Sequence, residues 1–124
     1  MFEKWFKTKT AYVQVFKDSF RIYCAESQKL FIVDGSFSHP RMLLGDFAHA
    51  EQILKQQIKQ QSMFSNLGSF KVIVHPKELL EGGLSIIEQR AFKELFLSVG
   101  FREAVIWQHQ DLSDEQLKTF DWKD

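Results

Sequence analysis

The chain has 124 residues, of which 44% are hydrophobic and 26% charged, a balance typical of one globular domain that buries its core without disulfides or structural metal. Sixteen basic residues offset sixteen acidic ones, which argues against a nucleic-acid partner, because proteins that bind nucleic acid carry a basic excess. The one cysteine, Cys24, excludes an internal disulfide and fits a reducing, cytoplasmic compartment. We expect a single domain over residues 1–124, with Cys24 as a small buried apolar residue.

The first ten residues combine aromatic rings with lysines. Phe2, Trp5 and Phe6 would share one side of a helical turn, with Lys4 and Lys7 beside them. Rings at a headgroup boundary and lysines near anionic lipid are typical of a peripheral membrane anchor. A second interpretation is an N-terminal arm whose rings pack on the edge of the domain. A membrane span is not expected, because no apolar run approaches the roughly 20 residues that it requires.

Three short strands are expected next. Over residues 11–16, Tyr12, Gln14 and Phe16 alternate with Val13 and Val15, which is the period of a strand, and further strands are predicted at 20–25 and 30–33. The segments 17–19 and 26–28 supply the turns between them. This pattern predicts an antiparallel meander whose third strand lies at the edge of the sheet, where a partner could add a strand.

A helix and a buried strand follow the meander. Asp46 is the expected N-cap of a helix that runs to about Gln61 with one apolar stripe. A loop is predicted at 66–69, and 70–74 is a short apolar strand of the kind found in parallel sheets. Pro76 is expected to begin the next loop.

The last third of the chain repeats this alternation. A capping-box pattern at Ser85 begins a second helix, which is expected to reach Val99 and to stop at Gly100. Residues 104–107 form the fifth predicted strand, and a second capping-box pattern at Ser113 starts a final helix.

The predicted element order is therefore βββαβαβα, which indicates an α/β fold with a five-stranded mixed sheet. Right-handed crossovers would add the fourth and fifth strands parallel to the first, in the strand order 3-2-1-4-5. This is the order of a ribonuclease-H-like or actin-like half-domain.

Several segments support a family resemblance. The sequence MFEKWFK at the start, LLGDF at 43–47 and above all IIEQRAFKELFLSVGFREAVIW at 86–107 resemble the first subdomain of the bacterial actin homologue MreB. The positions that fit the family pattern in the longest segment are Glu88, Arg90, Ala91, Arg102 and Glu103. The chain resembles a shortened form of that subdomain, without the second small subdomain and without the second half of an actin-like protein.

The resemblance implies an ATP site that this chain has altered. The family's phosphate loop has an Asp-x-Gly-Thr pattern, in which glycine lets the backbone approach the phosphates. Gln14, Phe16 and Lys17 stand at the Asp, Gly and Thr positions here. The family's Glu-Glu-Pro, which positions the attacking water, is replaced at 108–110 by Gln-His-Gln, and glutamine is a poor base. We expect the segment at 17–19 to be a turn and not a phosphate site.

Other chemistry has little support in the sequence. A two-metal nuclease needs convergent carboxylates, and the first strand offers Gln14 where one should stand. Ser85 is expected to cap a helix, and no nucleophile motif surrounds it. The histidines follow no metal-ligand spacing; they are His39, His49, His75 and His109. We expect no catalytic residue, no metal and no cofactor.

The interpretation that follows is a non-catalytic, actin-like scaffold or protein-interaction module. The resemblance links it to bacterial cell-shape or pilus-assembly machinery, in the cytoplasm and at the surface of the inner membrane. The alternative is a partial nucleotide-binding protein that binds ATP only with a second half supplied by another chain.

Overall fold

The computed structural model of the protein describes residues 8–38, 42–78 and 83–122. The candidate N-terminal arm or anchor falls outside the described residues; its members are Phe2, Lys4, Trp5, Phe6 and Lys7.

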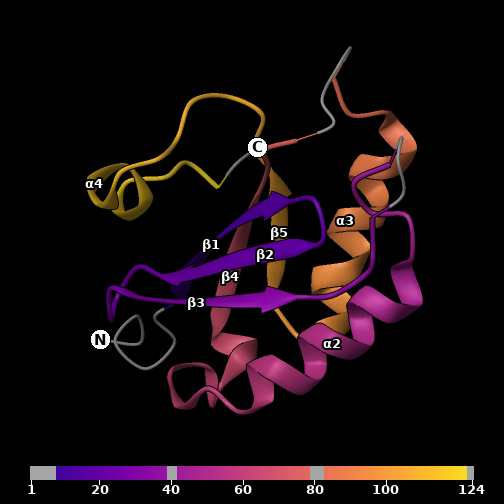
Figure 1. Cartoon of the computed structure of the whole chain (residues 1–124). Helices are drawn as coiled ribbons and strands as arrows, with labels where there is room; N and C mark the ends of the chain where they lie inside the picture. The colour runs from indigo at the N-terminus through magenta and orange to yellow at the C-terminus, as the bar shows by residue number, and fades with distance from the viewer. Residues whose placement is uncertain (1–7, 39–41, 79–82, 123–124) are drawn as a thin grey trace.

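Five strands form one mixed sheet in the order β3-β2-β1-β4-β5, which confirms the predicted order (Figure 1). They are β1 (Lys9–Phe16), β2 (Ser19–Cys24), β3 (Lys29–Asp34), β4 (Phe70–Pro76) and β5 (Glu103–Ile106). β1 pairs antiparallel with β2, and β2 pairs antiparallel with β3. β4 lies parallel to both β1 and β5. The meander and the two parallel additions are thus as expected.

The described helices begin at the predicted caps. They are α2 (Phe47–Lys59), α3 (Ile86–Val99) and α4 (Asp114–Lys118). The side chains of Asp46, Ser85 and Ser113 accept hydrogen bonds from the amides of His49, Glu88 and Gln116, respectively. None of the helices in these described ranges is long and apolar enough to cross a membrane.

The segment between α2 and β4 differs from the prediction. In place of a plain loop, two 3-10 helices occur, η1 (Ser62–Phe64) and η2 (Leu67–Ser69). Phe64 of η1 is buried and lies 4.7 Å from the ring of Phe70, measured between centroids. The segment is ordered by this aromatic packing, which short-range sequence patterns do not reveal.

Pro76 is the last residue of β4 and not the start of a loop, which corrects the prediction. The amide of Lys77 donates to the carbonyl of Val15 in β1, and the amide of Trp107 donates to the carbonyl of Val74. Since backbone groups alternate in direction along a strand, position 76 faces the β5 side. The paired part of β5 ends at Ile106 opposite Val74, so the missing amide hydrogen of Pro76 costs no ladder bond.

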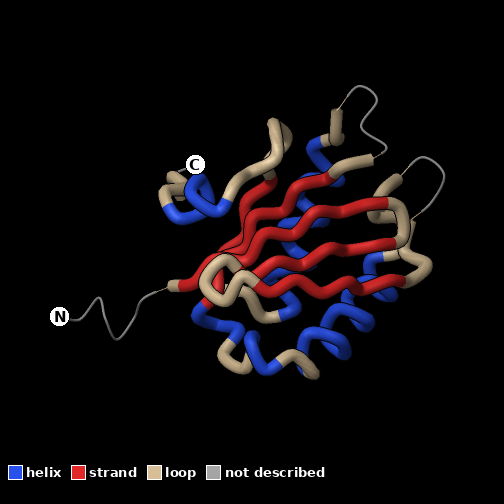
Figure 2. Tube along the Cα trace, turned by 60° about the vertical axis from the view of Figure 1, so that its left-hand side comes forward, coloured by secondary structure: helices blue, strands red, loops and turns tan. Residues whose placement is uncertain are grey.

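The sheet separates two layers of unequal size (Figures 1 and 2). α2 and α3 cover one face, and the main core lies between them and the sheet. Its aromatic centre is Phe20, which stacks on Phe37 at 4.3 Å and meets Phe96 edge-on at 5.9 Å between ring centroids. Cys24 is buried on the same face, as expected. On the opposite face, the C-terminal segment with α4 covers a smaller cluster around Tyr12, Ile73 and Leu117.

Phe37 closes the main core, so its truncation tests the packing. Its side chain is fully buried against Phe20. We expect Phe37→Ala to lower the free energy of unfolding by about 3–5 kcal/mol in urea denaturation, because it removes apolar contacts and leaves a cavity. Ile86→Ala, at a side chain that is 74% exposed, is the control and should change it by less than about 0.5 kcal/mol. Similar losses in both variants would contradict this packing.

Candidate functional site

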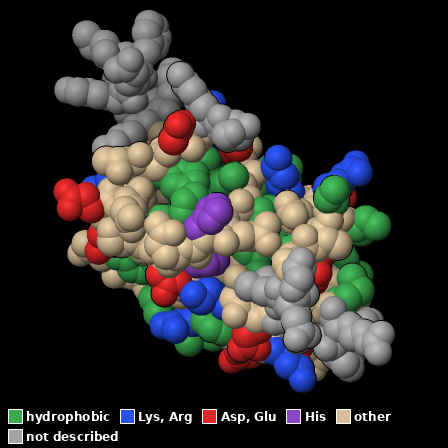
Figure 3. Space-filling model, turned by 90° about the horizontal axis from the view of Figure 1, so that it is seen from above, with side chains coloured by type: hydrophobic (Ala, Val, Ile, Leu, Met, Phe, Trp, Pro, Cys, Tyr) green, Lys and Arg blue, Asp and Glu red, His purple; other side chains and the backbone are tan. Residues whose placement is uncertain are grey.

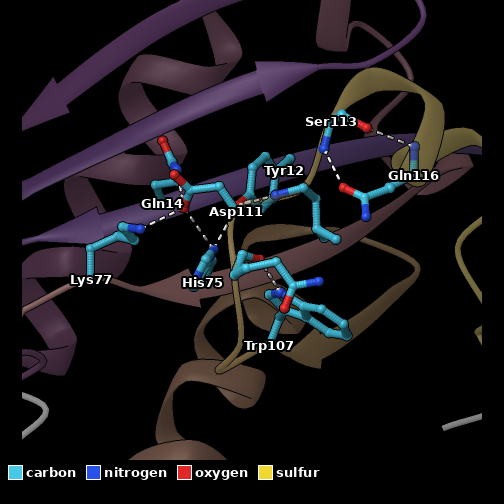
Figure 4. Close-up of polar contacts among 10 residues, drawn as sticks. Tyr12, Gln14, His75, Lys77, Trp107, Asp111, Ser113 and Gln116 are labelled. Atoms are coloured by element: carbon cyan, nitrogen blue, oxygen red, sulfur yellow. Dashed lines mark hydrogen bonds and ion pairs between the residues drawn. The ribbon is translucent and has the colours of Figure 1, made fainter.

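The carboxyl ends of the parallel strands gather polar side chains on the face opposite α2 and α3. In open α/β sheets, ligands bind outside the carboxyl ends of the strands. Gln14 of β1 stands opposite His75 of β4 in the parallel register, and Asp111 follows β5. Figure 4 shows these side chains converging with Tyr12 and Lys77. We call Tyr12, Gln14, His75, Lys77 and Asp111 the β1–β4 cluster.

A buried hydrogen bond joins the two strands. The Tyr12 hydroxyl lies 2.6 Å from Nδ1 of His75, and the two residues are only 6% and 3% exposed. The amide of Leu112 donates to the Tyr12 oxygen at 3.3 Å. The Tyr12 hydroxyl donates to Nδ1 of His75 in the neutral tautomer that carries its hydrogen on Nε2.

One carboxylate oxygen organises the exposed part of the cluster. Oδ1 of Asp111 lies 2.5 Å from Nζ of Lys77 and 3.4 Å from Nε2 of Gln14, which donates to it. Nδ1 of His75 is 3.8 Å from the same oxygen. Gln14 is thus a hydrogen-bond partner of a carboxylate.

The pKa shifts make Tyr12 a weaker acid, and His75 a weaker base, than these side chains are in water. Burial, and then the Lys77 cation, lower the pKa of His75, although Asp111 opposes them. Burial is the largest cause that raises the pKa of Tyr12. The hydrogen bond from Lys77 is the largest cause that lowers the pKa of Asp111. At neutral pH, Tyr12 and His75 are therefore both uncharged, and the Asp111 carboxylate beside them is ionised.

The cluster fastens the C-terminal segment to the sheet. Besides the bonds of Asp111 and Leu112, the Tyr23 hydroxyl donates to Oδ1 of Asp114 at 2.5 Å, and this bond raises the pKa of Tyr23 to about 12. Gln28 donates to the other oxygen of Asp114 at 3.3 Å. The polar bonds and the buried side chain of Leu117 together hold the segment over β1 and β2.

The β1–β2 turn uses its polar groups internally. The amide of Lys17 donates to Oε1 of Glu78 at 3.1 Å, and the amide of Asp18 donates to Oγ of Ser38 at 3.0 Å. Asp18 has a φ of 58°, and its Oδ1 accepts from the amides of Phe37 at 3.0 Å and Ser38 at 2.7 Å. The carboxylate of Asp18 therefore holds the segment after β3, at Phe37 and Ser38, against this turn.

The other residues singled out in the sequence take separate places. Phe16 is the half-buried last residue of β1, and the side chain of Lys17 is exposed in the turn. Gln108 accepts from the amide of Leu84 at 3.3 Å, and the carbonyl of Gln110 accepts from the Trp107 indole at 2.8 Å. The ring of His109 meets that of Trp107 edge-on. These groups follow β5, and the backbone of His109 also hydrogen-bonds to His75 of the β1–β4 cluster.

Three residues of the cluster were missed in the sequence: Tyr12, Lys77 and Asp111. Tyr12 is 63 positions from His75, and only the strand register brings them together. The alternation of β1 did place Tyr12 and Gln14 on one face, which was the available signal. His39 lies outside the described residues. Among the residues that the structure describes, no group of three or more His, Cys, Asp or Glu side chains could hold a metal ion.

Charge around the cluster is mixed. Figure 3 looks down on this end of the molecule and shows hydrophobic side chains beside histidine, with acidic and basic side chains spread around them. A separate groove of about 680 Å³ lies on the helical side, between the end of α2 and the 3-10 helices, and Lys55, Lys59, Phe64 and Leu67 are among its lining residues. The groove shares no residue with the β1–β4 cluster.

Comparison with known proteins gives a relative in Escherichia coli. The chain is 30% identical over 90 residues to the uncharacterized protein YjaA of strain K12, and the alignment covers 68% of this chain and 71% of YjaA. The chain belongs to the YjaA family. No protein-family model matches it. Because YjaA is uncharacterized, the relationship indicates no activity. A function for this member of the YjaA family is therefore inferred from the arrangement of its side chains.

Asp18 tests the internal role of the turn. We expect Asp18→Gly to lower the free energy of unfolding by about 2 kcal/mol, because glycine keeps the positive φ but leaves the amides of Phe37 and Ser38 without their acceptor. Asp18→Asn keeps an acceptor and tolerates this φ, so it should cost less than about 1 kcal/mol. Urea denaturation of the two variants measures the difference, and equal losses would contradict the proposed bonds.

His75 should make stability depend on pH. Its pKa is lowered in the folded state, so the unfolded chain binds the proton more tightly. Its contribution is fully present above the unfolded pKa of about 6.5 and is lost as pH falls towards the folded pKa, with a slope of at most about 1.4 kcal/mol per pH unit.

The measurement is urea denaturation at several pH values for the wild type and for His75→Gln. We expect the variant to lose this part of the slope, whereas the control His49→Gln, on α2, should retain it. A slope that is unchanged in His75→Gln would contradict the assignment.

Proposed function

We propose that this member of the YjaA family is a non-catalytic protein-interaction or scaffold module, built on an actin-like half-domain of ribonuclease-H-like topology. The order β3-β2-β1-β4-β5, with an antiparallel meander and two parallel additions, supports the actin-like assignment. The segment with the strongest resemblance to the MreB family coincides with α3 and β5. These observations support a shared ancestry with the MreB family. The function is argued from the β1–β2 turn and the β1–β4 cluster.

The bonding of the β1–β2 turn carries the proposal. A phosphate loop needs free amides and close approach of the backbone. Here, the amides of Lys17 and Asp18 already donate to Glu78 and Ser38. The carboxylate of Glu78 also lies against the turn, where it would repel a phosphate. A nucleotide could bind there only if these bonds were broken.

The side chains around Gln14, which the MreB resemblance sets at the phosphate-loop Asp position, support the same proposal. Gln14 donates to Asp111, and that carboxylate is neutralised by Lys77. The neutral Tyr12–His75 pair is held by the C-terminal segment. These groups serve to close the sheet, so a role in binding must fall to another surface.

The free edge of the sheet is the surface that fits such a role. β3 is the last strand of the sheet on one side, and its exposed side chains include Leu30 and Ile32. Exposed apolar groups on an unpaired strand favour strand addition by a partner. The proposal places the module in the cytoplasm at the inner membrane, with cell-shape or pilus-assembly machinery. The aromatic and lysine residues of segment 1–7 support that location through their sequence alone.

Titration with Mg-ATP tests the proposal against the alternative of a partial nucleotide-binding protein. We expect no binding heat in calorimetry with the isolated chain, because the turn amides are occupied. Lys17→Ala should leave this result unchanged, as should the control Lys29→Ala at the far edge of the sheet. Micromolar binding that Lys17→Ala abolishes and Lys29→Ala preserves would overturn the proposal in favour of the nucleotide-binding alternative.

A further inference from the structure

Among the residues that the structure describes, no strand pairs with the outer edge of β3. It runs for six residues, KLFIVD, with its charged residues only at the two ends and no proline. Natural proteins commonly protect such edges with inward charges, prolines, bulges or very short strands. An unprotected apolar edge therefore calls for a partner strand.

The outward backbone groups of β3 follow from the ladder with β2. The amide of Gly35 donates to the carbonyl of Asp18 at 3.1 Å, which continues the register that pairs Asp34 with Ser19. In antiparallel strands, bonded and non-bonded pairs alternate. Odd-numbered positions of β3 thus bond to β2, and Leu30, Ile32 and Asp34 direct their amides and carbonyls to the free edge.

The same residues carry exposed apolar side chains. Leu30 is 46% exposed and Ile32 is 52% exposed, on the sheet face opposite α2 and α3. Their β2 neighbours in the register are Tyr23 and Arg21. Outward hydrogen-bonding groups and exposed apolar side chains therefore coincide at two alternate positions, which is the arrangement that strand addition uses.

We propose that a second copy of this chain occupies the edge, with β3 pairing antiparallel to β3 about a two-fold axis perpendicular to the sheet. The inference rests on the proposed interaction role and names its partner. Antiparallel pairing places the Lys29 end of one strand beside the Asp34 end of the other, so that opposite charges approach each other at both ends of the ladder, although their side chains lie on opposite faces of the sheet. Parallel pairing would put like charges side by side.

The faces of the two sheets set the register. A continuous sheet requires paired residues to share a face, so an even position of one copy pairs with an even position of the other. With Phe31 opposite Phe31 of the second copy, Leu30 pairs with Ile32 of the second copy, and this apolar pair occurs twice. The next permitted register, with Ile32 opposite Ile32 of the second copy, sets Leu30 against the carboxylate of Asp34. The first register is therefore the one we assign.

The oligomeric state tests the pairing. We expect the full chain to sediment as a dimer at micromolar concentration and Ile32→Pro to be a monomer. Proline removes an amide that faces the free edge and leaves the bonds of β2 to β3 intact. Circular dichroism should show that the variant remains folded. Ile87→Lys, at a side chain on α3 that is 76% exposed, is the matched control and should remain a dimer.

Cross-linking tests the register. Directly opposed residues have Cβ atoms about 4.5–5.5 Å apart, and positions two residues out of register lie farther apart. A mixture of Leu30→Cys and Ile32→Cys chains should form several-fold more disulfide-linked dimer than either variant alone, and the native Cys24 is buried. Preferential cross-linking of Ile32→Cys to itself would overturn the assigned register.

The failures of the two proposals are distinguishable. A wild-type chain that is a monomer at all concentrations would overturn self-pairing. If the same monomer captured a different protein from native cells, and Ile32→Pro abolished the capture but Ile87→Lys did not, the interaction role would stand without self-pairing. Mg-ATP binding dependent on Lys17 would overturn the interaction role itself, whatever the oligomeric state.

Discussion

The parallel pairing of β1 with β4 is the constraint on which the rest of the structure depends. Seven residue pairs, from Lys9–Phe70 to Val15–Pro76, join the N-terminal meander to the later α/β part of the chain. This ladder sets Gln14 beside His75. It also brings Lys17 within reach of Glu78, just past its end. The two layers of the core and the polar cluster all follow from this single register.

The same register explains what could be predicted from the sequence. Alternation located the meander, and the side chains of Asp46, Ser85 and Ser113 marked three helix starts, because these signals are local. The strand order followed from the element order and the handedness of crossovers. The Tyr12–His75 bond did not follow, because it joins residues 63 positions apart and depends on register. The prediction for Pro76 was wrong for a related reason. Whether a proline removes a ladder hydrogen bond depends on which neighbouring strand its nitrogen faces, and that also follows from the register.

The β1–β2 turn uses its backbone amides within the chain. In a nucleotide-binding loop, the backbone amides are left for the ligand. Here, Asp18 and Glu78 satisfy the turn and its neighbours from within the chain, at 2.7–3.1 Å. The bonds tie the turn to the links that follow β3 and β4, so they stabilise the fold. The proposed interaction role accordingly shifts attention to the sheet edge at β3.

The C-terminal segment has a consequence for the order of assembly during synthesis. Residues 107–122 cover Tyr12, Tyr23 and Ile73 on the face of strands that leave the ribosome much earlier. Until that segment emerges, the nascent sheet presents these apolar side chains to water and to chaperones, even though its helical side can already be packed. The last described residues to be translated therefore complete the domain.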